Sequence, residues 1–170
     1  MNIDDLMAPG KHPIRVAQFG TGNFLRAFTD YMIDVANEAG VFDGDIVMVK
    51  QVPGKGSDRL AAQGGQYHVI LQGKQDGKIV DEVRTVTAVR GTVNPYTDYE
   101  AYQALARLDT LRFLVSNTTE AGIVYDETDK FDALPAASYP GRLVQFLYER
   151  YQHVSAYDRI MMPDYSYKHR

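Results

Sequence analysis

The sequence contains neither cysteine nor tryptophan among its 170 residues. The absence of cysteine excludes disulfide bonds, thiolate metal sites and a cysteine nucleophile. No apolar run approaches the roughly 20 residues that a membrane-spanning helix needs. The acidic start, Met1–Leu6, also lacks the basic and apolar regions of a signal peptide. We therefore expect a cytoplasmic protein with no membrane partner.

Clusters of basic residues are also missing. The 18 lysines and arginines are scattered along the chain, and the formal net charge is -4. Proteins that bind nucleic acids gather basic side chains where they follow the phosphates, so no nucleic-acid partner is expected. The four histidines show neither metal-ligand spacing nor a triad arrangement, so no metal site is expected. The length and the 45% of hydrophobic residues are typical of one globular domain.

The most informative motif is an apolar segment that runs into two glycines and then into an amphipathic segment. Ile14–Phe19 is typical of a buried strand, and Asn23–Ala39 has apolar residues at the three-and-four spacing of a helix. Gly20 allows a tight turn, and Gly22 lets a pyrophosphate approach the backbone, where helix N–H groups face it. Dinucleotide fingerprints have a third glycine where this chain has Leu25, so the pair alone is weak evidence.

The rest of the chain predicts a parallel sheet with an insertion. Strands are expected at 46–49 and 111–116, and helices at about 97–108 and from Pro140 onward. Segments 67–72, 78–82 and 85–89 follow one another across turns, which favours an antiparallel insertion. Ile160–Met162 is expected to form one more strand. The predicted fold class is α/β, a Rossmann-like, doubly wound, mostly parallel sheet with an antiparallel β insertion.

Polar residues follow the strand expected at 111–116. Ligands of open parallel sheets bind outside the carboxyl ends of the strands, so Gly20–Phe24 and Ser116–Glu120 are expected to line one crevice. Asn117 and Thr118 offer donors and acceptors for a ribose or a nicotinamide amide, although an ordinary capped turn explains this run equally well. Arg26 can reach a phosphate or a substrate carboxylate, and a surface ion pair is its simpler interpretation.

The second strand lacks the usual acidic residue that binds the adenine ribose. The chain has Lys50 and Gln51 there. Either Gln51 hydrogen-bonds the ribose, or Lys50 and Arg59 accommodate a 2′-phosphate, and a solvated surface position explains each of them as well. The choice between NAD and NADP stays open on this evidence. A methyltransferase, whose S-adenosylmethionine site follows a similar turn, is a further alternative that normally requires the same acid.

Several runs, taken together in order and spacing, resemble one family. They are Phe19–Phe28, Ser116–Ile123, Lys130–Asp132, Pro135-Ala136, Ser138–Pro140 and Leu147–Arg150. With these runs the chain resembles the mannitol dehydrogenase family of polyol-specific long-chain dehydrogenases from Ile14 to about Met162. Within the family, Gly-x-Gly-Asn-Phe and Ser-Asn-Thr-Thr-Glu-Ala-Gly are most similar to the uronate reductases.

The resemblance implies hydride transfer between NADH and the keto group of D-tagaturonate, which gives D-altronate in hexuronate catabolism. Fructuronate reductase or another polyol dehydrogenase is the alternative within the family. The implied cofactor is NAD. The implied pyrophosphate contacts are Gly20, Thr21, Gly22, Asn23 and Phe24, with Asn117 and Thr118 nearer the nicotinamide; Arg26 and Gln51 complete the predicted cofactor site.

Family members are longer and continue into a helical substrate domain that carries the general-base lysine. No position of this chain matches that lysine, so catalytic residues stay unassigned, and a uronate or polyol partner is expected only with such a domain. The expected domains are 1–13, a lead; 14–163, the NAD(P)-binding domain; and 164–170, a tail that departs from the family. We expect a shortened or frameshifted sequence. The alternative function is a non-catalytic nucleotide-binding or interaction module.

Overall fold

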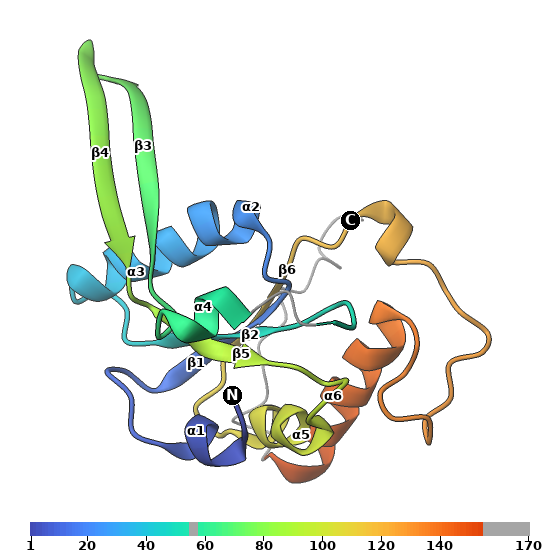
Figure 1. Cartoon of the computed structure of the whole chain (residues 1–170). Helices are drawn as coiled ribbons and strands as arrows, with labels where there is room; N and C mark the ends of the chain where they lie inside the picture. Colours follow the sequence, from blue (N-terminus) through green and yellow to red (C-terminus); the bar gives the residue numbers. More distant parts are fainter. Residues whose placement is uncertain (55–57, 155–170) are drawn as a thin grey trace, which may run out of the picture.

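The computed structural model describes residues 1–54 and 58–154, and its centre is a four-stranded parallel sheet in the order β5-β2-β1-β6 (Figure 1). The strands of this sheet are β1 (Ile14–Phe19), β2 (Asp45–Val49), β5 (Val89–Val93) and β6 (Phe113–Ser116). Phe19 is paired with Val49 on one side and with Ser116 on the other. The carboxyl ends of β1, β2 and β6 therefore meet at one edge of the sheet.

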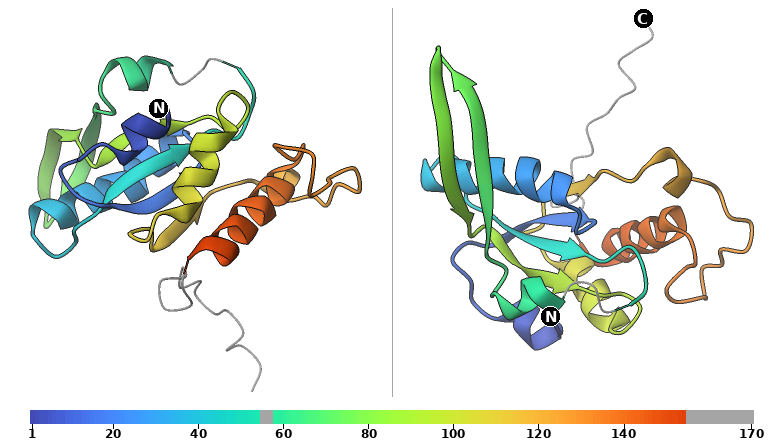
Figure 2. Two further views of the ribbon diagram at one scale, coloured as in Figure 1. Left: turned by 90° about the horizontal axis from the view of Figure 1, so that it is seen from below. Right: turned by 45° about the horizontal axis from the view of Figure 1, so that its top comes forward.

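Helices cover both faces of this sheet (Figure 2). They are α1 (Ile3–Met7), α2 (Asn23–Leu25), the π-helical segment η1 (Arg26–Asp30), α3 (Tyr31–Glu38), α4 (Asp58–Ala62), α5 (Tyr99–Arg107), the 3-10 turn η2 (Glu120–Gly122) and α6 (Tyr139–His153). α2, η1 and α3 follow one another without a break and form the helix predicted at Asn23–Ala39. The parallel strand-helix-strand arrangement confirms the predicted Rossmann-like fold class.

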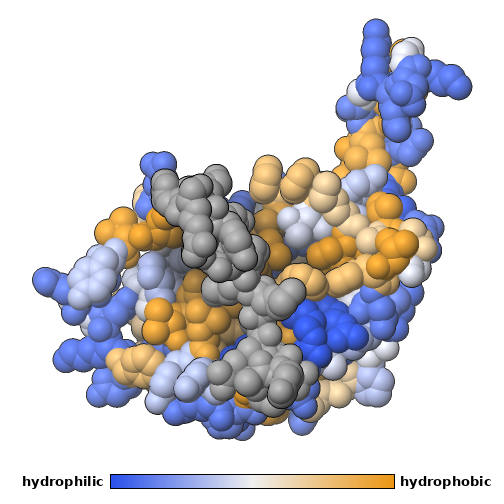
Figure 3. All heavy atoms as spheres, turned by 180° about the vertical axis from the view of Figure 1, so that it is seen from behind, coloured by the Kyte–Doolittle hydropathy of each residue, from blue (hydrophilic) through white to orange (hydrophobic). Residues whose placement is uncertain are grey.

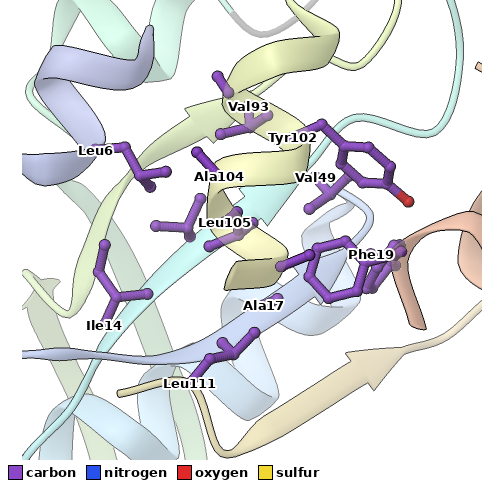
Figure 4. Packing of buried hydrophobic residues seen from close by; sticks show 14 residues of the cluster. Leu6, Ile14, Ala17, Phe19, Val49, Val93, Tyr102, Ala104, Leu105 and Leu111 are labelled. Atoms are coloured by element: carbon purple, nitrogen blue, oxygen red, sulfur yellow. The ribbon is translucent and has the colours of Figure 1, made fainter. Parts of the chain in front are cut away.

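Phe19 belongs to the larger core cluster and lies at the side of it where side chains of α5 and α6 meet the sheet (Figure 4). Its ring meets the rings of Tyr102 and Phe146 edge-on, with centroids 6.5 and 5.4 Å apart. All three side chains are at most 1% exposed. Burying a side chain of this size stabilises the fold by about 1.5–3 kcal/mol, so this cluster fixes α5 and α6 on the sheet.

Helix α6 carries three buried polar side chains, Arg142, Gln145 and Arg150, that bind backbone carbonyls of other segments. Arg150 donates to the carbonyls of Ala106 and Leu111, at 2.9 and 2.8 Å. These bonds satisfy carbonyls around the end of α5, where helical partners are missing. Buried charged groups need such partners, so these bonds set the position of α6 against α5.

The antiparallel insertion contains two strands, β3 (Tyr67–Gln75) and β4 (Lys78–Val86), which form a hairpin that projects from the body (Figure 1). The expectation of a third antiparallel strand at 85–89 is wrong, because Val89 begins β5, which pairs in parallel with β2. The physical reason lies in helix α3. Asp34 accepts the N–H of Thr87 at 2.7 Å and redirects the chain there. The strand predicted at 160–162 lies outside the described residues.

The apolar stripe of the long helix faces outward. Phe24, Phe28 and Met32 are 62%, 52% and 53% exposed, whereas Leu25, Asp30 and Asp34 are buried. The surface around the base of the hairpin is correspondingly rich in apolar side chains (Figure 3). The spacing of apolar residues predicted the helix correctly. It did not predict which face of the helix is buried, because the apolar stripe faces outward. Within the described ranges, no helix has both the length and the apolar character needed to cross a membrane.

Two adjacent glycines before β3 offer a matched test of this packing. Both have positive φ, +63° at Gly64 and +81° at Gly65, but only Gly65 lies against β5. A Cβ at Gly65 would lie 2.1 Å from the carbonyl oxygen of Val89, whereas none of the surrounding atoms lies within 4 Å of one at Gly64. We expect Gly64→Ala to lower the free energy of unfolding by about 1 kcal/mol and Gly65→Ala by at least about 3 kcal/mol. Urea unfolding measures both, and equal losses would contradict the packing.

Candidate functional site

The turn after β1 has the geometry that the sequence predicted. Gly20 has a φ of +128°, which side chains disfavour, and its N–H donates to the carbonyl of Val49 at 2.9 Å. A Cβ on Gly20 would lie 3.5 Å from Oδ1 of Asn117. The structure therefore brings the glycine turn against the loop that follows β6, as expected for one crevice at this edge.

Gly22 faces open space where α2 begins. A Cβ at Gly22 would have no atom within 4 Å apart from its chain neighbours and its own helix, and Gly22 occupies the N-cap position without a side-chain cap. The first N–H groups of the helix therefore have no side-chain partner from the cap, and an anion can approach them. Asn23 and Phe24 are exposed at this end, and Thr21 is half-buried.

A cleft of about 720 Å³ opens next to the loop that follows β6, and residues 20–24 of the glycine turn are not among those that line it. It is bounded by the end of β2, by the loop after β6 and by the start of α6, and it is lined by Gln51, Thr118, Tyr125, Ser138 and Arg142 among others. Two predicted site residues, Gln51 and Thr118, are thus brought together although they are far apart in the sequence. The cleft lies at the carboxyl ends of parallel strands, where ligands of this fold class bind.

Gln51 is held in place through its backbone. Its carbonyl accepts hydrogen bonds from Arg142 at 3.0 Å and from the hydroxyl of Tyr96 at 2.7 Å, and the Arg142 guanidinium lies 5.2 Å from the centre of the Tyr96 ring. The Gln51 side-chain nitrogen donates to Val49, while its buried Oε1 has no partner among the described residues. A ribose hydroxyl can donate a hydrogen bond to such an unpaired acceptor.

The remaining predicted contacts have partners within the protein. Arg26 donates to the side chain of Asn23 and lies 5.4 Å from the centre of the Tyr67 ring, and it forms no surface ion pair with the described residues. Lys50 is buried and donates to the carbonyl of Gly54. The side chain of Arg59 lies outside the described residues.

The loop after β6 contains the local turn that was the alternative interpretation of this run. The hydroxyls of Ser116 and Thr118 are 2.7 Å apart, and the N–H of Thr118 donates to Oγ of Ser116 at 3.2 Å. This turn does not remove the residues from the site, because Thr118 lines the cleft and Asn117 lies beside Gly20. The local turn is therefore present, and the ligand contact of Asn117 and Thr118 stays a prediction.

Sequence reasoning missed a buried polar cluster beneath the glycine turn. Gln18 and Asp30 are 0% exposed. The Gln18 nitrogen Nε2 donates to the carbonyl of Gly20 at 3.2 Å and lies 3.5 Å from Asp30 Oδ2, which accepts from the Tyr67 hydroxyl at 2.9 Å. A glutamine inside an apolar strand and an aspartate inside a helix were the available signals. Burial raises the pKa of Asp30 to about 6, against the opposing effect of the Tyr67 hydrogen bond.

Asp34, one helical turn further on, is paired differently. Burial by itself would raise the pKa of Asp34, but hydrogen bonds from Thr87 and Arg84 hold that pKa below its usual value. Arg84 donates to Oδ2 through two nitrogens, at 2.9 and 2.7 Å. Asp34 is therefore stable as a carboxylate that anchors the base of the hairpin, whereas none of the described cations lies within hydrogen-bonding distance of Asp30.

Two features define the Rossmann class of nucleotide-binding domains. The first strand of a twisted parallel sheet ends in a glycine turn, and a cleft lies at the carboxyl ends of the neighbouring strands. The chain belongs to the mannitol dehydrogenase family, because the family model described as the mannitol dehydrogenase Rossmann domain matches residues 14–162. This finding confirms the resemblance seen in the sequence.

Known relatives agree with this assignment. The chain is 43% identical over 142 residues to the altronate oxidoreductase of Bacillus subtilis (strain 168), covering 84% of this chain and 30% of that protein. It is 42% identical over 147 residues to the altronate oxidoreductase of Klebsiella pneumoniae (strain 342), covering 85% of this chain and 30% of that protein. The chain thus spans about 30% of the length of these curated relatives.

The fold is also found in a solved structure, the Pseudomonas fluorescens mannitol 2-dehydrogenase in ternary complex with NAD and D-mannitol. The TM-score is 0.68 at 21% sequence identity, and the match covers 84% of this chain and 32% of that chain. At this identity the likeness shows the fold.

The two buried aspartates predict opposite effects of neutralisation. Between pH 4 and 6 folded Asp30 retains a proton that the unfolded chain releases, so the folded protein loses stability as the pH rises through this range. We expect Asp30→Asn to raise the free energy of unfolding at pH 8 by up to about 3 kcal/mol, with no gain below pH 4. Asp34→Asn, the control, should destabilise at pH 8 because Arg84 and the N–H of Thr87 lose a buried charged acceptor, and Arg84 keeps only the exposed Glu38. Urea unfolding at both pH values decides; an Asp30→Asn protein that is less stable at pH 8 contradicts the pKa shift.

Proposed function

We propose that this chain is the NAD-binding part of an NAD-dependent oxidoreductase. The observation that carries the proposal is the arrangement at one sheet edge. Gly22 opens onto empty space at the start of α2, Oδ1 of Asn117 lies 3.5 Å from where a Cβ on Gly20 would be, and a cleft is lined by Gln51 and Thr118. The NAD complex of the structurally similar mannitol 2-dehydrogenase supports the choice of cofactor.

The residues at this edge fit the parts of a dinucleotide. The N–H groups after Gly22 bind the pyrophosphate, and the missing side chain leaves room for it. The Gln51 Oε1 accepts from the hydroxyls of the adenine ribose, and Asn117 and Thr118 bind the nicotinamide end. With Lys50 bonded to Gly54, the hydroxyl-binding arrangement favours NAD over NADP. When bound, the nicotinamide cofactor would accept the hydride in the oxidation direction and donate it, as NADH, in the reduction direction.

The substrate we propose is the pair D-tagaturonate and D-altronate, in hexuronate catabolism. Support comes from the altronate oxidoreductases, which match over more than four-fifths of this chain at 40–43% identity. Fructuronate reductase or another polyol dehydrogenase remains the alternative within the family.

A second candidate function, nucleotide binding without turnover, is favoured by one observation. Of the described residues that line the cleft, none is a lysine, the family's general base; its titratable side chains are Tyr125, Asp126, Glu127, Tyr139 and Arg142. In this second candidate function the chain binds and orients the cofactor without moving a substrate proton.

Calorimetric titration with NADH and NADPH, followed by an absorbance assay of NADH oxidation with tagaturonate and fructuronate, tests the proposal. We expect NADH to bind more tightly than NADPH, with no oxidation of NADH by this chain alone. Turnover would show that a base in this chain serves the reaction. If neither nucleotide binds, the proposed cofactor role is wrong.

Gly22→Val separates cofactor binding from folding. Its φ of -71° suits any residue and its surroundings are open, so the free energy of unfolding should change by less than about 1 kcal/mol. The added side chain occupies the pyrophosphate position, and we expect the Kd for NADH to rise at least about tenfold. The matched control is Gly73→Val, which also enters open space but lies on the projecting hairpin. Equal Kd values in the two variants, measured by calorimetry, would place the pyrophosphate elsewhere.

A further inference from the structure

The buried cluster of Gln18, Asp30 and Tyr67, which we name the sub-turn cluster, joins three elements directly beneath the glycine turn. Gln18 comes from β1, Asp30 from η1 and Tyr67 from β3. Its link to the turn is the Gln18 Nε2, which lies within hydrogen-bonding distance of both the Gly20 carbonyl and Asp30 Oδ2, at 3.2 and 3.5 Å. Nothing in the proposed cofactor contacts uses this cluster.

The sub-turn cluster has fewer protons than acceptors when Asp30 is ionised. The Tyr67 hydroxyl has one proton, yet it lies 2.9 Å from Asp30 Oδ2 and 3.0 Å from the carbonyl oxygen of Arg26. Oε1 of Gln18 and Oδ1 of Asp30 are buried and have no partner among the described residues. Each unsatisfied buried acceptor is costly. A proton on Asp30 lets its carboxyl donate to the Tyr67 oxygen, which frees the Tyr67 proton for Arg26.

Protonation of Asp30 also affects the turn. A carboxylate attracts the Gln18 amide more strongly than a neutral carboxyl does, and it competes with the Gly20 carbonyl for that donor. An ionised Asp30 further places a negative charge under the site where the two phosphates would bind. Both effects have the same sign, because each makes the turn a better anion site when Asp30 is neutral.

We infer that Asp30 is a positioning residue of the glycine turn, acting through Gln18, and that dinucleotide binding is coupled to the uptake of a proton by its carboxyl group. This inference rests on the proposed cofactor role of the turn. The ligand chemistry it concerns is the pyrophosphate, which all adenine dinucleotides and ADP-ribose share.

The charged and titratable groups around Asp30 support this coupling. Arg26, on the same helix, favours the carboxylate; Tyr67, from β3, donates to it; and Asp34 lies one turn further along and is held by Arg84. A phosphate that draws the Arg26 guanidinium from its place over the Tyr67 ring removes the cation that, among the described residues, favours ionisation of Asp30. With the free-state pKa of Asp30 already near 6, the proton is taken up in an accessible pH range.

The test is calorimetric titration with ADP-ribose between pH 5.5 and 8, in buffers of different ionisation enthalpy. A rise of one unit in the pKa of Asp30 on binding makes the Kd about sevenfold higher at pH 8 than at pH 5.5. We expect this rise, with proton uptake near pH 6, in the wild type. Asp30→Asn should bind with a Kd that is independent of pH and without proton uptake.

Two control variants separate Asp30 from other titrating groups. Asp34→Asn removes a buried carboxylate on the same helix that does not touch the turn, and His68→Asn removes an exposed imidazole next to Tyr67. Both should keep the wild-type pH dependence of the Kd. If the dependence survives in Asp30→Asn, or disappears in His68→Asn, the inference is overturned while the proposed function stands. If the wild type binds ADP-ribose at no pH, the proposed function itself fails.

A direct measurement covers the case in which Asp30→Asn does not fold. Carbon-13 NMR of the Asp30 carboxyl in the wild-type chain reports its titration with and without ADP-ribose. We expect the midpoint to rise by about one pH unit in the complex, which is a tenfold preference for the protonated state. An unchanged midpoint in a saturated complex would overturn the inference.

Discussion

The hydrogen bond from the Gln18 amide to the Gly20 carbonyl is the interaction on which the candidate site depends. Gly20 has a φ of +128°, which the chain maintains because its N–H is bonded to Val49 on β2 and its carbonyl to Gln18 on β1. Gly22 is thereby presented to open space at the start of α2. Burying a polar glutamine in an apolar strand is unfavourable, but the hydrogen bond that its amide donates to Gly20 holds the turn in one geometry.

The cleft has a second support in helix α6. Arg142 bonds the carbonyl of Gln51 and two carbonyls before the helix, at Ala136 and Ala137, and Gln145 receives the N–H of Ala136 at 2.9 Å. These bonds link the wall of the cleft to the end of β2 through side chains that are almost fully buried. The long connection between β6 and α6 is thus ordered around the cleft without regular secondary structure of its own beyond η2.

The fold class could be predicted from patterns of a few adjacent residues. The wrong prediction, the strand at 85–89, concerned a segment whose pairing depends on residues far away in the chain. β1 and the long helix were predictable because apolar spacing and the two glycines are local features. Residues 85–89 were assigned to the hairpin because β-branched residues favour a strand but do not identify its partner. The partner was decided by Asp34, more than fifty residues earlier in the chain. Likewise, an aspartate inside a helix was a signal at Asp30, but the local sequence did not identify Gln18 and Tyr67 as its partners.

The sequence by itself determined the class of the domain, its family and the position of the glycine turn, since these depend on residues that are neighbours in the chain. Only the tertiary structure decided that Gln51 and Thr118 share a cleft, that Arg26 rests on Tyr67, and that the apolar stripe through Phe24 and Phe28 faces outward. The physical reason is that burial and hydrogen bonding are properties of the packed chain. A side chain's neighbours in space, with their donors and charges, determine whether it binds a ligand or the protein itself.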